Sequence, residues 1–295
     1  MITAVLDDPA FPLSETMLET VVRAALDEDR AYEDVTTLSV VPASLRASAV
    51  LVARSAGVIA GLPLMEAVFM LLDPAVKCRR LEQDGARVSA NQAVLAIEGT
   101  ARAMLSGERV ALNFVQRLSG IATLTAQFVQ AVRGTEAKIL DTRKTTPGLR
   151  ALERYAVRCG GGTNHRYDLS AAVLIKDNHL AAVGGDIALA VRRARAGAPA
   201  GMQVEVECDR RDQVEAALAA GADVILLDNM SSEEMRACVE LARGAAILEA
   251  SGGITLSSVR AVAETGVDWI SVGALTHSAP SLDLALDFES GPGDG

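Results

Sequence analysis

The sequence is poor in aromatic residues and cysteine, and it contains no long hydrophobic run. Aromatic residues make up 3% of the 295 positions although 50% are hydrophobic, so we expect a core built mainly from Ala, Val and Leu. No segment reaches the roughly 18 uninterrupted apolar residues that a membrane helix requires, and the N-terminus lacks the pattern of a signal peptide. We therefore expect a soluble protein with no membrane partner.

Cysteine and charge narrow the class further. The four cysteines lie far apart and form no C-x-x-C pair, which favours reduced thiols and a cytoplasmic location. The formal net charge is −10, which argues against nucleic acid as a partner. The length allows either one large barrel or two domains.

The first 121 residues are expected to form an α+β domain. Residues 15–29 place apolar side chains at helical spacing, and residues 62–73 and 101–132 also predict helices, the last one dented by Gly107 and Gly120. Residues 46–61 and 84–99 contain strand-like pieces that are closed by glycines. No motif in this part indicates a chemistry.

The sequence pattern changes near residue 135. Short apolar runs such as "AVLIKDN", "MQVEVEC" and "DVILLDN" alternate with alanine-rich segments of helical pattern. This alternation predicts parallel strands that are buried on both faces. Six or seven units fit a closed α/β barrel better than an open sheet, although the periodicity leaves the open sheet as an alternative.

Polar and charged residues follow the predicted strands. In α/β barrels, the carboxyl ends of several strands together form the active site. Both signs of charge occur at these ends, which favours a functional rim over a series of solvated edges. The residues concerned are Asp141, Arg143, Lys144, Lys176, Glu205, Glu207, Asp228, Glu249 and Ser251.

Positive charge is concentrated in one segment. Residues 138–176 carry a net charge of +5, while the rest of the chain carries −15. This local field predicts a site for a small molecule with several negative charges. Three arginines at helical spacing, Arg150, Arg154 and Arg158, are better explained as the outer face of a helix. The better candidates for binding an anion are Arg143, Lys144, Arg166 and Lys176.

The acidic residues and the glycines suggest a phosphate-bearing substrate. Glu207 and Asp228 end neighbouring strands, and paired carboxylates suit Mg²⁺ that is also bound by phosphate oxygens. "SGG" at 251–253 and "GAL" at 273–275 follow the last two strands, where small residues let backbone N–H groups approach a phosphate.

Longer motifs resemble one known family. "DTRKTTPGLRALERYAVRCGGGTNHR", "LIKDNH", "LLDNM", "ASGGI" and "SVGALTHS" are similar to the quinolinate phosphoribosyltransferases of NAD synthesis. The resemblance extends over nearly the whole chain, including "DEDRAYEDVTT" and "SGERVALNFVQRLSGIAT". It implies an α/β sandwich N-terminal domain (1–121), joined by the C-terminal segment (about 280–295), and an open, incomplete α/β barrel (122–279).

The resemblance also implies a reaction and an assembly. The family transfers the ribosyl phosphate of phosphoribosyl pyrophosphate (PRPP) to the ring nitrogen of quinolinate, with Mg²⁺. The products are nicotinate mononucleotide, pyrophosphate and CO₂. A homodimer is expected, with a higher oligomer left open, in which each active site borrows Arg109 from its neighbour.

Matched to this chain, the family's site residues divide into three groups. The quinolinate carboxylates would contact Arg143, His165, Arg166 and Lys176. Three residues would be catalytic: Lys144 would lie between the two substrates, near the donor. Glu207 and Asp228 would hold the ribose hydroxyls and Mg²⁺, the metal partly through substrate and water. The 5′-phosphate of the donor would contact Ser251, Gly252, Gly253, Gly273 and Ala274, and Thr142 is a further substrate-binding residue.

Other positions near the motifs have expected structural roles. The glycine run at 160–162 would allow the tight turn that delivers His165. His179 and His277 are expected to hold loops through hydrogen bonds. Asp168 departs from the glycine that is common in the family, and an aspartate tolerates left-handed geometry there.

Several other functions remain as alternatives. Nicotinate phosphoribosyltransferase handles one carboxylate and needs fewer cations, and a molybdenum-associated relative of the family is a second alternative. Lys144 or Lys176 would act as a Schiff-base lysine in an aldolase. A sensor that binds dicarboxylates would bind ligand without forming product.

Overall fold

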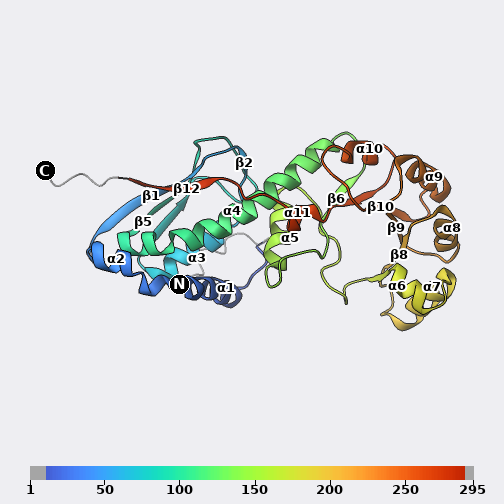
Figure 1. The fold of residues 1–295 in the computed structure, drawn as a ribbon, viewed down its shortest axis with the longest axis horizontal. Helices are drawn as coiled ribbons and strands as arrows, with labels where there is room; N and C mark the ends of the chain where they lie inside the picture. The colour runs from blue at the N-terminus through green and yellow to red at the C-terminus, as the bar shows by residue number, and fades with distance from the viewer. Residues whose placement is uncertain (1–10, 290–295) are drawn as a thin grey trace. The chain divides into compact units, whose positions relative to one another are not determined.

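The computed structural model describes residues 11–289, which form two compact units (Figure 1). The first unit contains residues 11–124, Thr146–Gly161 and 279–289, and the second contains Thr125–Thr145 and Gly162–Ser278. The units differ from the predicted domains mainly in residues 146–161, which lie within the predicted barrel but belong to the first unit, as do residues 122–124 and residue 279.

The first unit contains a four-stranded antiparallel sheet in the order β12-β1-β5-β3, and a separate β2–β4 pair. Figure 1 shows β12 beside β1, and the register places Leu286 opposite Leu51. The C-terminal segment therefore completes this sheet, as the resemblance implied. The strands are β1 (Arg46–Ala53), β2 (Gly57–Val58), β3 (Lys77–Arg80), β4 (Arg87–Val88), β5 (Ala93–Thr100) and β12 (Leu284–Glu289).

Helices pack beside this sheet because each buries an apolar stripe. In α1, Leu18, Val22 and Leu26 recur at every fourth position and are fully buried, and the Ser14 side chain caps the N-terminus by accepting from Met17 N. The helices of the first unit are α1 (Glu15–Glu28), the 3₁₀ helix η2 (Ala31–Glu33), α2 (Val35–Val40), α3 (Leu62–Leu72), α5 (Arg150–Cys159) and most of α4 (Ala101–Ala131).

Helix α4 is continuous through both of its glycines, so the predicted dents at Gly107 and Gly120 are wrong. A Cβ at Gly107 would lie 2.8 Å from Leu72 Cδ1 of α3, and a Cβ at Gly120 would lie 2.0 Å from the backbone oxygen of Pro280. The two glycines therefore allow close packing, one against α3 and the other against the returning C-terminal segment.

The second unit is a six-stranded parallel sheet in the order β6-β11-β10-β9-β8-β7, with helices between successive strands. The consecutive strands β6 and β7 lie at opposite ends of this order, so the sheet is an open barrel rather than the closed one that the periodicity favoured. Its elements are β6 (Lys138–Leu140), β7 (Val173–Ile175), α6 (Asp177–Ala182), α7 (Ile187–Gly197), β8 (Val204–Cys208), α8 (Arg211–Ala219), β9 (Val224–Asp228), α9 (Ser232–Ala242), β10 (Ile247–Ser251), α10 (Val259–Ala263), β11 (Trp269–Ser271) and α11 (Ala274–His277).

Helix α5 packs in the first unit through an aromatic side chain. The fully buried Tyr155 donates its hydroxyl to Asp84 at 2.9 Å, and Phe11 meets its ring edge-on at a centroid distance of 5.3 Å. Arg154 is also buried, with 7% of its surface exposed. The expectation that it lines an outer helix face is therefore wrong.

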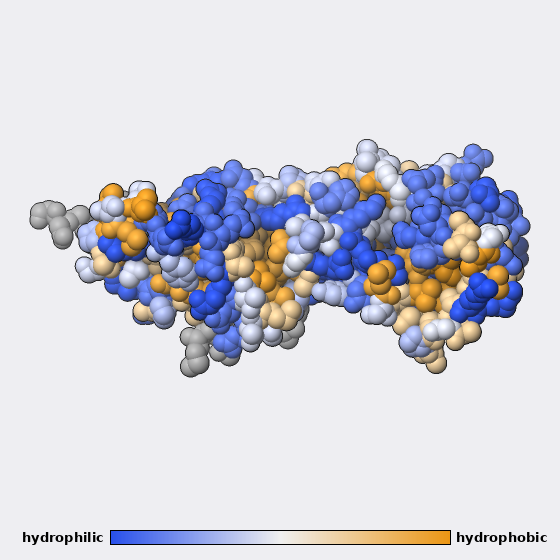
Figure 2. All heavy atoms as spheres, turned by 60° about the horizontal axis from the view of Figure 1, so that its bottom comes forward, coloured by the Kyte–Doolittle hydropathy of each residue, from blue (hydrophilic) through white to orange (hydrophobic). Residues whose placement is uncertain are grey.

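The surface carries separate apolar patches. Val35, Leu38 and Val40 of α2 are exposed, and Figure 2 shows hydrophobic atoms at the end of the first unit that carries this helix. Within residues 11–289, no helix combines the length and the apolar character needed to cross a membrane.

Candidate active site

The strand register gathers polar side chains at the carboxyl end of the barrel. Asp228, the last residue of β9, lies opposite Ser251 of β10, and Glu207 of β8 lies opposite Leu226 of β9. Because alternate residues of a strand share a face, Glu207, Asp228 and Ser251 point to the same side of the sheet. All three are half-buried, so they form a rim that solvent reaches.

A second, deeper layer lies on the same face. Glu205 and Glu249 come two residues before Glu207 and Ser251 in β8 and β10. They are 3% and 1% exposed. The barrel therefore holds two buried carboxylates beneath the polar rim, in the interior layer that barrels usually fill with apolar side chains.

The glycine run positions His165 and Arg166 through a fixed loop. Gly161 has a φ of +86°, so the predicted need for glycine at this turn is met at that position. The buried Asp141 carboxylate then accepts from His165 N at 2.8 Å and from Asn164 Nδ2 at 2.6 Å. The end of β6 thus holds the loop that carries His165.

The His165 ring meets both deep carboxylates. Its Nε2 lies 3.3 Å from Glu205 Oε2 and 3.2 Å from Glu249 Oε2. Burial lowers the pKa of His165, but the contacts with Glu205 and Glu249 outweigh this effect and raise the pKa to about 10. Burial also raises the pKa of Glu205, although His165 and Arg166 oppose that rise.

The guanidinium groups of Arg143 and Arg166 lie near each other in the second unit. Burial lowers the pKa of Arg166, and the positive charge of Arg143 lowers it further. Arg166 Nη1 donates to the Ala172 carbonyl at 2.9 Å, whereas Arg143 Nε is buried and has no hydrogen-bond partner. Arg143 and Arg166 repel each other, and Arg143 has a buried N–H that makes no hydrogen bond, so the pair is suited to bind an anion.

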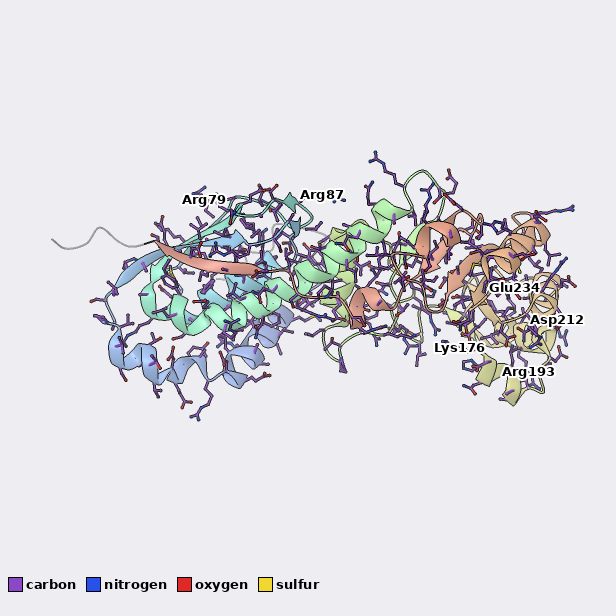
Figure 3. The ribbon with its side chains drawn as sticks, turned by 45° about the horizontal axis from the view of Figure 1, so that its top comes forward. Arg79, Arg87, Lys176, Arg193, Asp212 and Glu234 are labelled. Atoms are coloured by element: carbon purple, nitrogen blue, oxygen red, sulfur yellow. The ribbon has the colours of Figure 1, made fainter. Side chains whose placement is uncertain are left out.

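Lys176 follows β7 and pairs with Glu207 of the neighbouring strand β8. It is exposed, and its Nζ lies 3.4 Å from Glu207 Oε2. His179 Nδ1 accepts from the backbone N–H of Lys176 at 2.9 Å, which is the loop-holding hydrogen bond expected for His179. Figure 3 labels Lys176 and also Arg193, which belongs to α7.

The first glycine after β10 lies against Asn229, the residue that follows Asp228. Gly252 has a φ of +96°, and a Cβ there would lie 2.2 Å from Asn229 Oδ1. Asn229 Nδ2 in turn donates to Asp228 Oδ2 at 2.8 Å. Gly253 also has a positive φ, of +60°, but a Cβ there would meet nothing within 4 Å.

Lys144 lies beside the second glycine group. A Cβ at Gly273 would lie 3.1 Å from Lys144 Cδ and 3.2 Å from His277 Nε2. Thr276 donates to the Lys144 carbonyl at 2.7 Å, and Thr142 Oγ1 accepts from Lys144 N at 3.1 Å. The geometry thus brings Lys144 to the "GAL" segment that contains Gly273 and Ala274.

The structure corrects the expectation for Asp168 and gives a hydrogen-bond partner for His277. Asp168 is not among the residues with positive φ; its carboxylate instead accepts from the N–H and hydroxyl of Ser170, at 2.8 and 2.7 Å. His277 Nδ1 lies 2.5 Å from Ser278 Oγ, a contact within α11 and its C-cap.

The predicted site residue Arg109 lies outside the second unit, and no role is predicted from the sequence for Asp141, Glu205 or Glu249. Arg109 is exposed on α4, in the first unit. Asp141, Glu205 and Glu249 were recognised as charged strand ends without an assigned function. The spacing of Glu205 and Glu207 was the available signal, because it places both on one face of a strand.

A cavity in the first unit does not coincide with these residues. It has a volume of about 250 Å³ and is lined mainly by α1, α4 and α5, with Val110, Phe114 and Leu152 among its walls. None of the predicted site residues lines it. We therefore place the candidate site at the barrel rim, where the charged side chains converge.

Comparison with known proteins identifies the family of this chain. The family description "Quinolinate phosphoribosyl transferase, N-terminal domain" matches residues 34–119, and "Quinolinate phosphoribosyl transferase, C-terminal domain" matches residues 121–287. The nicotinate-nucleotide pyrophosphorylase [carboxylating] of Mycobacterium leprae is 46% identical over 275 residues, covering 90% of this chain and 95% of that protein.

Two further relatives extend the comparison. A probable nicotinate-nucleotide pyrophosphorylase [carboxylating] of Bacillus subtilis is 45% identical over 260 residues, covering 88% of this chain and 89% of that protein. The solved structure of the nicotinate-nucleotide pyrophosphorylase from Francisella tularensis superposes with a TM-score of 0.90 at 39% identity, covering 96% and 99% of the two chains. The chain therefore belongs to the quinolinate phosphoribosyl transferase family.

Proposed function

We propose that this protein transfers the phosphoribosyl group of PRPP to quinolinate and decarboxylates the product, giving nicotinate mononucleotide, pyrophosphate and CO₂ for NAD biosynthesis. Family membership supports the reaction type. The observation that supports quinolinate as the substrate is the pair of neighbouring guanidinium groups of Arg143 and Arg166, together with Lys176 at the end of β7. Two adjacent carboxylates on one ring match such a cationic group.

The reaction needs no nucleophilic side chain. The ring nitrogen of quinolinate attacks C1 of the ribose as the bond from C1 to pyrophosphate breaks, and the nitrogen becomes cationic. The carboxylate on the adjacent carbon then leaves as CO₂, its electron pair is drawn toward the cationic ring, and a proton replaces it. The protein orients the two substrates and stabilises the charges that develop.

Chain residues divide these tasks by charge. Arg143, Arg166 and Lys176 hold the quinolinate carboxylates, and Lys144 lies between quinolinate and the donor. A carboxylate of Glu207 or Asp228 stabilises the positive charge that grows on the ribose. The "SGG" and "GAL" segments, with Thr142, bind the phosphate end of the donor through backbone and hydroxyl groups.

Glu207 and Asp228 also suit Mg²⁺. They are hard oxygen donors on neighbouring strands, they face the same side of the sheet, and both are open to solvent. When bound there, Mg²⁺ would neutralise negative charge on the pyrophosphate. The ion pair of Glu207 with Lys176 must then loosen as the metal and the substrates bind.

A homodimer completes the proposal, with Arg109 contributed to the neighbouring active site. Arg109 is exposed on α4, and the exposed apolar residues of α2 offer a surface for a second copy of the chain. The cytoplasmic location stays a prediction. Cross-linking through a cysteine introduced at Arg109 would test the exchange, and a monomeric active enzyme would refute it.

Mass spectrometry of two parallel reactions tests the function. One contains quinolinate, PRPP and Mg²⁺, and the other contains nicotinate in place of quinolinate. We expect nicotinate mononucleotide and CO₂ from quinolinate and no product from nicotinate. Product from nicotinate alone would overturn the substrate. A borohydride-trapped adduct with a carbonyl substrate would favour the aldolase alternative, and tight quinolinate binding without product would favour a sensor.

A further inference from the structure

Two buried carboxylates beneath the proposed substrate site have no role in the reaction as described. Within residues 11–289, His165, Glu205 and Glu249 form the one group of three possible metal ligands, with ligand atoms within 4.8 Å of one another. Glu205 Oε1 and Glu249 Oε2 are buried and accept no hydrogen bond, although Glu249 Oε2 lies 3.2 Å from the ring. These groups therefore need a physical explanation.

The second ring nitrogen decides between a metal site and a hydrogen-bonded support. His165 Nδ1 accepts from the backbone N–H of Arg166 at 2.7 Å, so its lone pair points at that donor. The contacts with the carboxylates raise the pKa of His165, and the Arg166 N–H faces the Nδ1 lone pair, so the proton that the carboxylates favour lies on Nε2. The ring then carries its proton on Nε2 and points it toward the carboxylates, which makes Nε2 unavailable to a metal.

The arrangement is costly, which indicates that it serves a purpose other than stability. Two carboxylates share one ring in a site from which water is largely excluded, and two of their oxygens remain unsatisfied. Buried ionic groups of this kind are often less stable than apolar side chains of the same volume. Arg143 from the end of β6 and Arg166 from the loop are the cations near this group, and Asp141 is the remaining anion that contacts the loop.

We propose that Glu205 and Glu249 are positioning residues for quinolinate binding, which act by fixing the His165 ring and, through its Nδ1, the backbone of Arg166. The Arg166 guanidinium is then held with Nη1 on the Ala172 carbonyl, close to the Arg143 guanidinium, with which it would bind a substrate carboxylate. This inference rests on the proposed function. It assigns a specificity role to the deep layer of the barrel.

Isosteric amides test the inference, because they keep the side-chain volume and remove the charge. For Glu205→Gln and for Glu249→Gln we expect KM for quinolinate to rise about tenfold, KM for PRPP to stay within about twofold, and the melting temperature not to fall. Glu66→Gln is the matched control, because Glu66 is equally buried but pairs with Arg80 at 2.6 and 2.7 Å in the first unit. That variant should lose melting temperature and keep both KM values.

A double-mutant cycle with His165→Ala shows whether the carboxylates act through the ring. In the His165→Ala background, Glu249→Gln should change KM for quinolinate by less than about twofold. A full tenfold rise in that background, or equal rises of both KM values with a lower melting temperature, would overturn the inference. A wild-type protein that does not convert quinolinate would instead refute the proposed function, so the two failures are distinguishable.

Discussion

Gly252→Ala should damage the barrel rim far more than the same change at the next residue. The φ of +96° at Gly252 disfavours any residue with a Cβ, and the new Cβ would lie 2.2 Å from Asn229 Oδ1 and 3.0 Å from Asn229 N. Asn229 cannot retreat freely, because its N–H donates to the Ser251 carbonyl at 2.9 Å and its amide donates to Asp228 at 2.8 Å.

The magnitude follows from these contacts. The left-handed backbone costs an alanine about 1 kcal/mol, and the displaced Asn229 loses one or two hydrogen bonds of about 1 kcal/mol each. With some overpacking strain, we expect Gly252→Ala to lower the free energy of unfolding by about 2–4 kcal/mol. Gly253→Ala shares the positive φ but meets nothing within 4 Å, so we expect about 1 kcal/mol.

Urea unfolding of both variants, followed by far-ultraviolet circular dichroism, measures the difference. The activity assay adds a second readout, because moving Asn229 also moves the Asp228 carboxylate that is proposed to face the donor. KM for PRPP should therefore rise more than tenfold in Gly252→Ala. Equal losses of stability in the two variants would show that the contact with Asn229 does not constrain the loop, and the reasoning would be refuted.

Three further predictions concern the first unit and the thiols. Tyr155→Phe removes the hydroxyl that donates to the buried Asp84, so the free energy of unfolding should fall by about 1–3 kcal/mol without a change in KM. Cys78 and Cys208 should resist a thiol reagent at pH 8 until the protein unfolds, because burial raises the pKa of each thiol to about 12. Deleting the chain from Leu284 onward should expose the edge of β1 and cause aggregation, measured by light scattering.

The helices and strands were largely predictable because each carries its own periodicity. The stripe of Leu18, Val22 and Leu26 defines α1 whatever it packs against. The partner of a buried face has no such local signal. The sequence of α5 indicates a helix with a buried side, but its contacts with the first unit, such as that between Tyr155 and Asp84, are what assign it to that unit rather than to the barrel.

The candidate site also has a part that local sequence patterns predict and a part that depends on which strands are neighbours. Strand ends identify Lys176, Glu207 and Asp228, because parallel strands bring their carboxyl ends to one edge. The deep pair was harder to predict, since Glu205 and Glu249 become neighbours of one ring only when the strand order and the register are both known. Closure of the barrel was overestimated, because periodicity counts the units and says nothing about whether the first and last strands pair.

The layers of charge explain why an acidic chain concentrates cations in one segment. Arg143 and Arg166 repel each other at the rim, and the lowered pKa of Arg166 records that repulsion together with burial. The negative charge of Glu205 in the deep layer offsets part of that repulsion. If the proposed site binds quinolinate, the dianion would remove the remaining repulsion, whereas a monoanion would leave one cation unmatched. The proposed preference for two carboxylates over one would then follow from the charge that the site carries before the substrate binds.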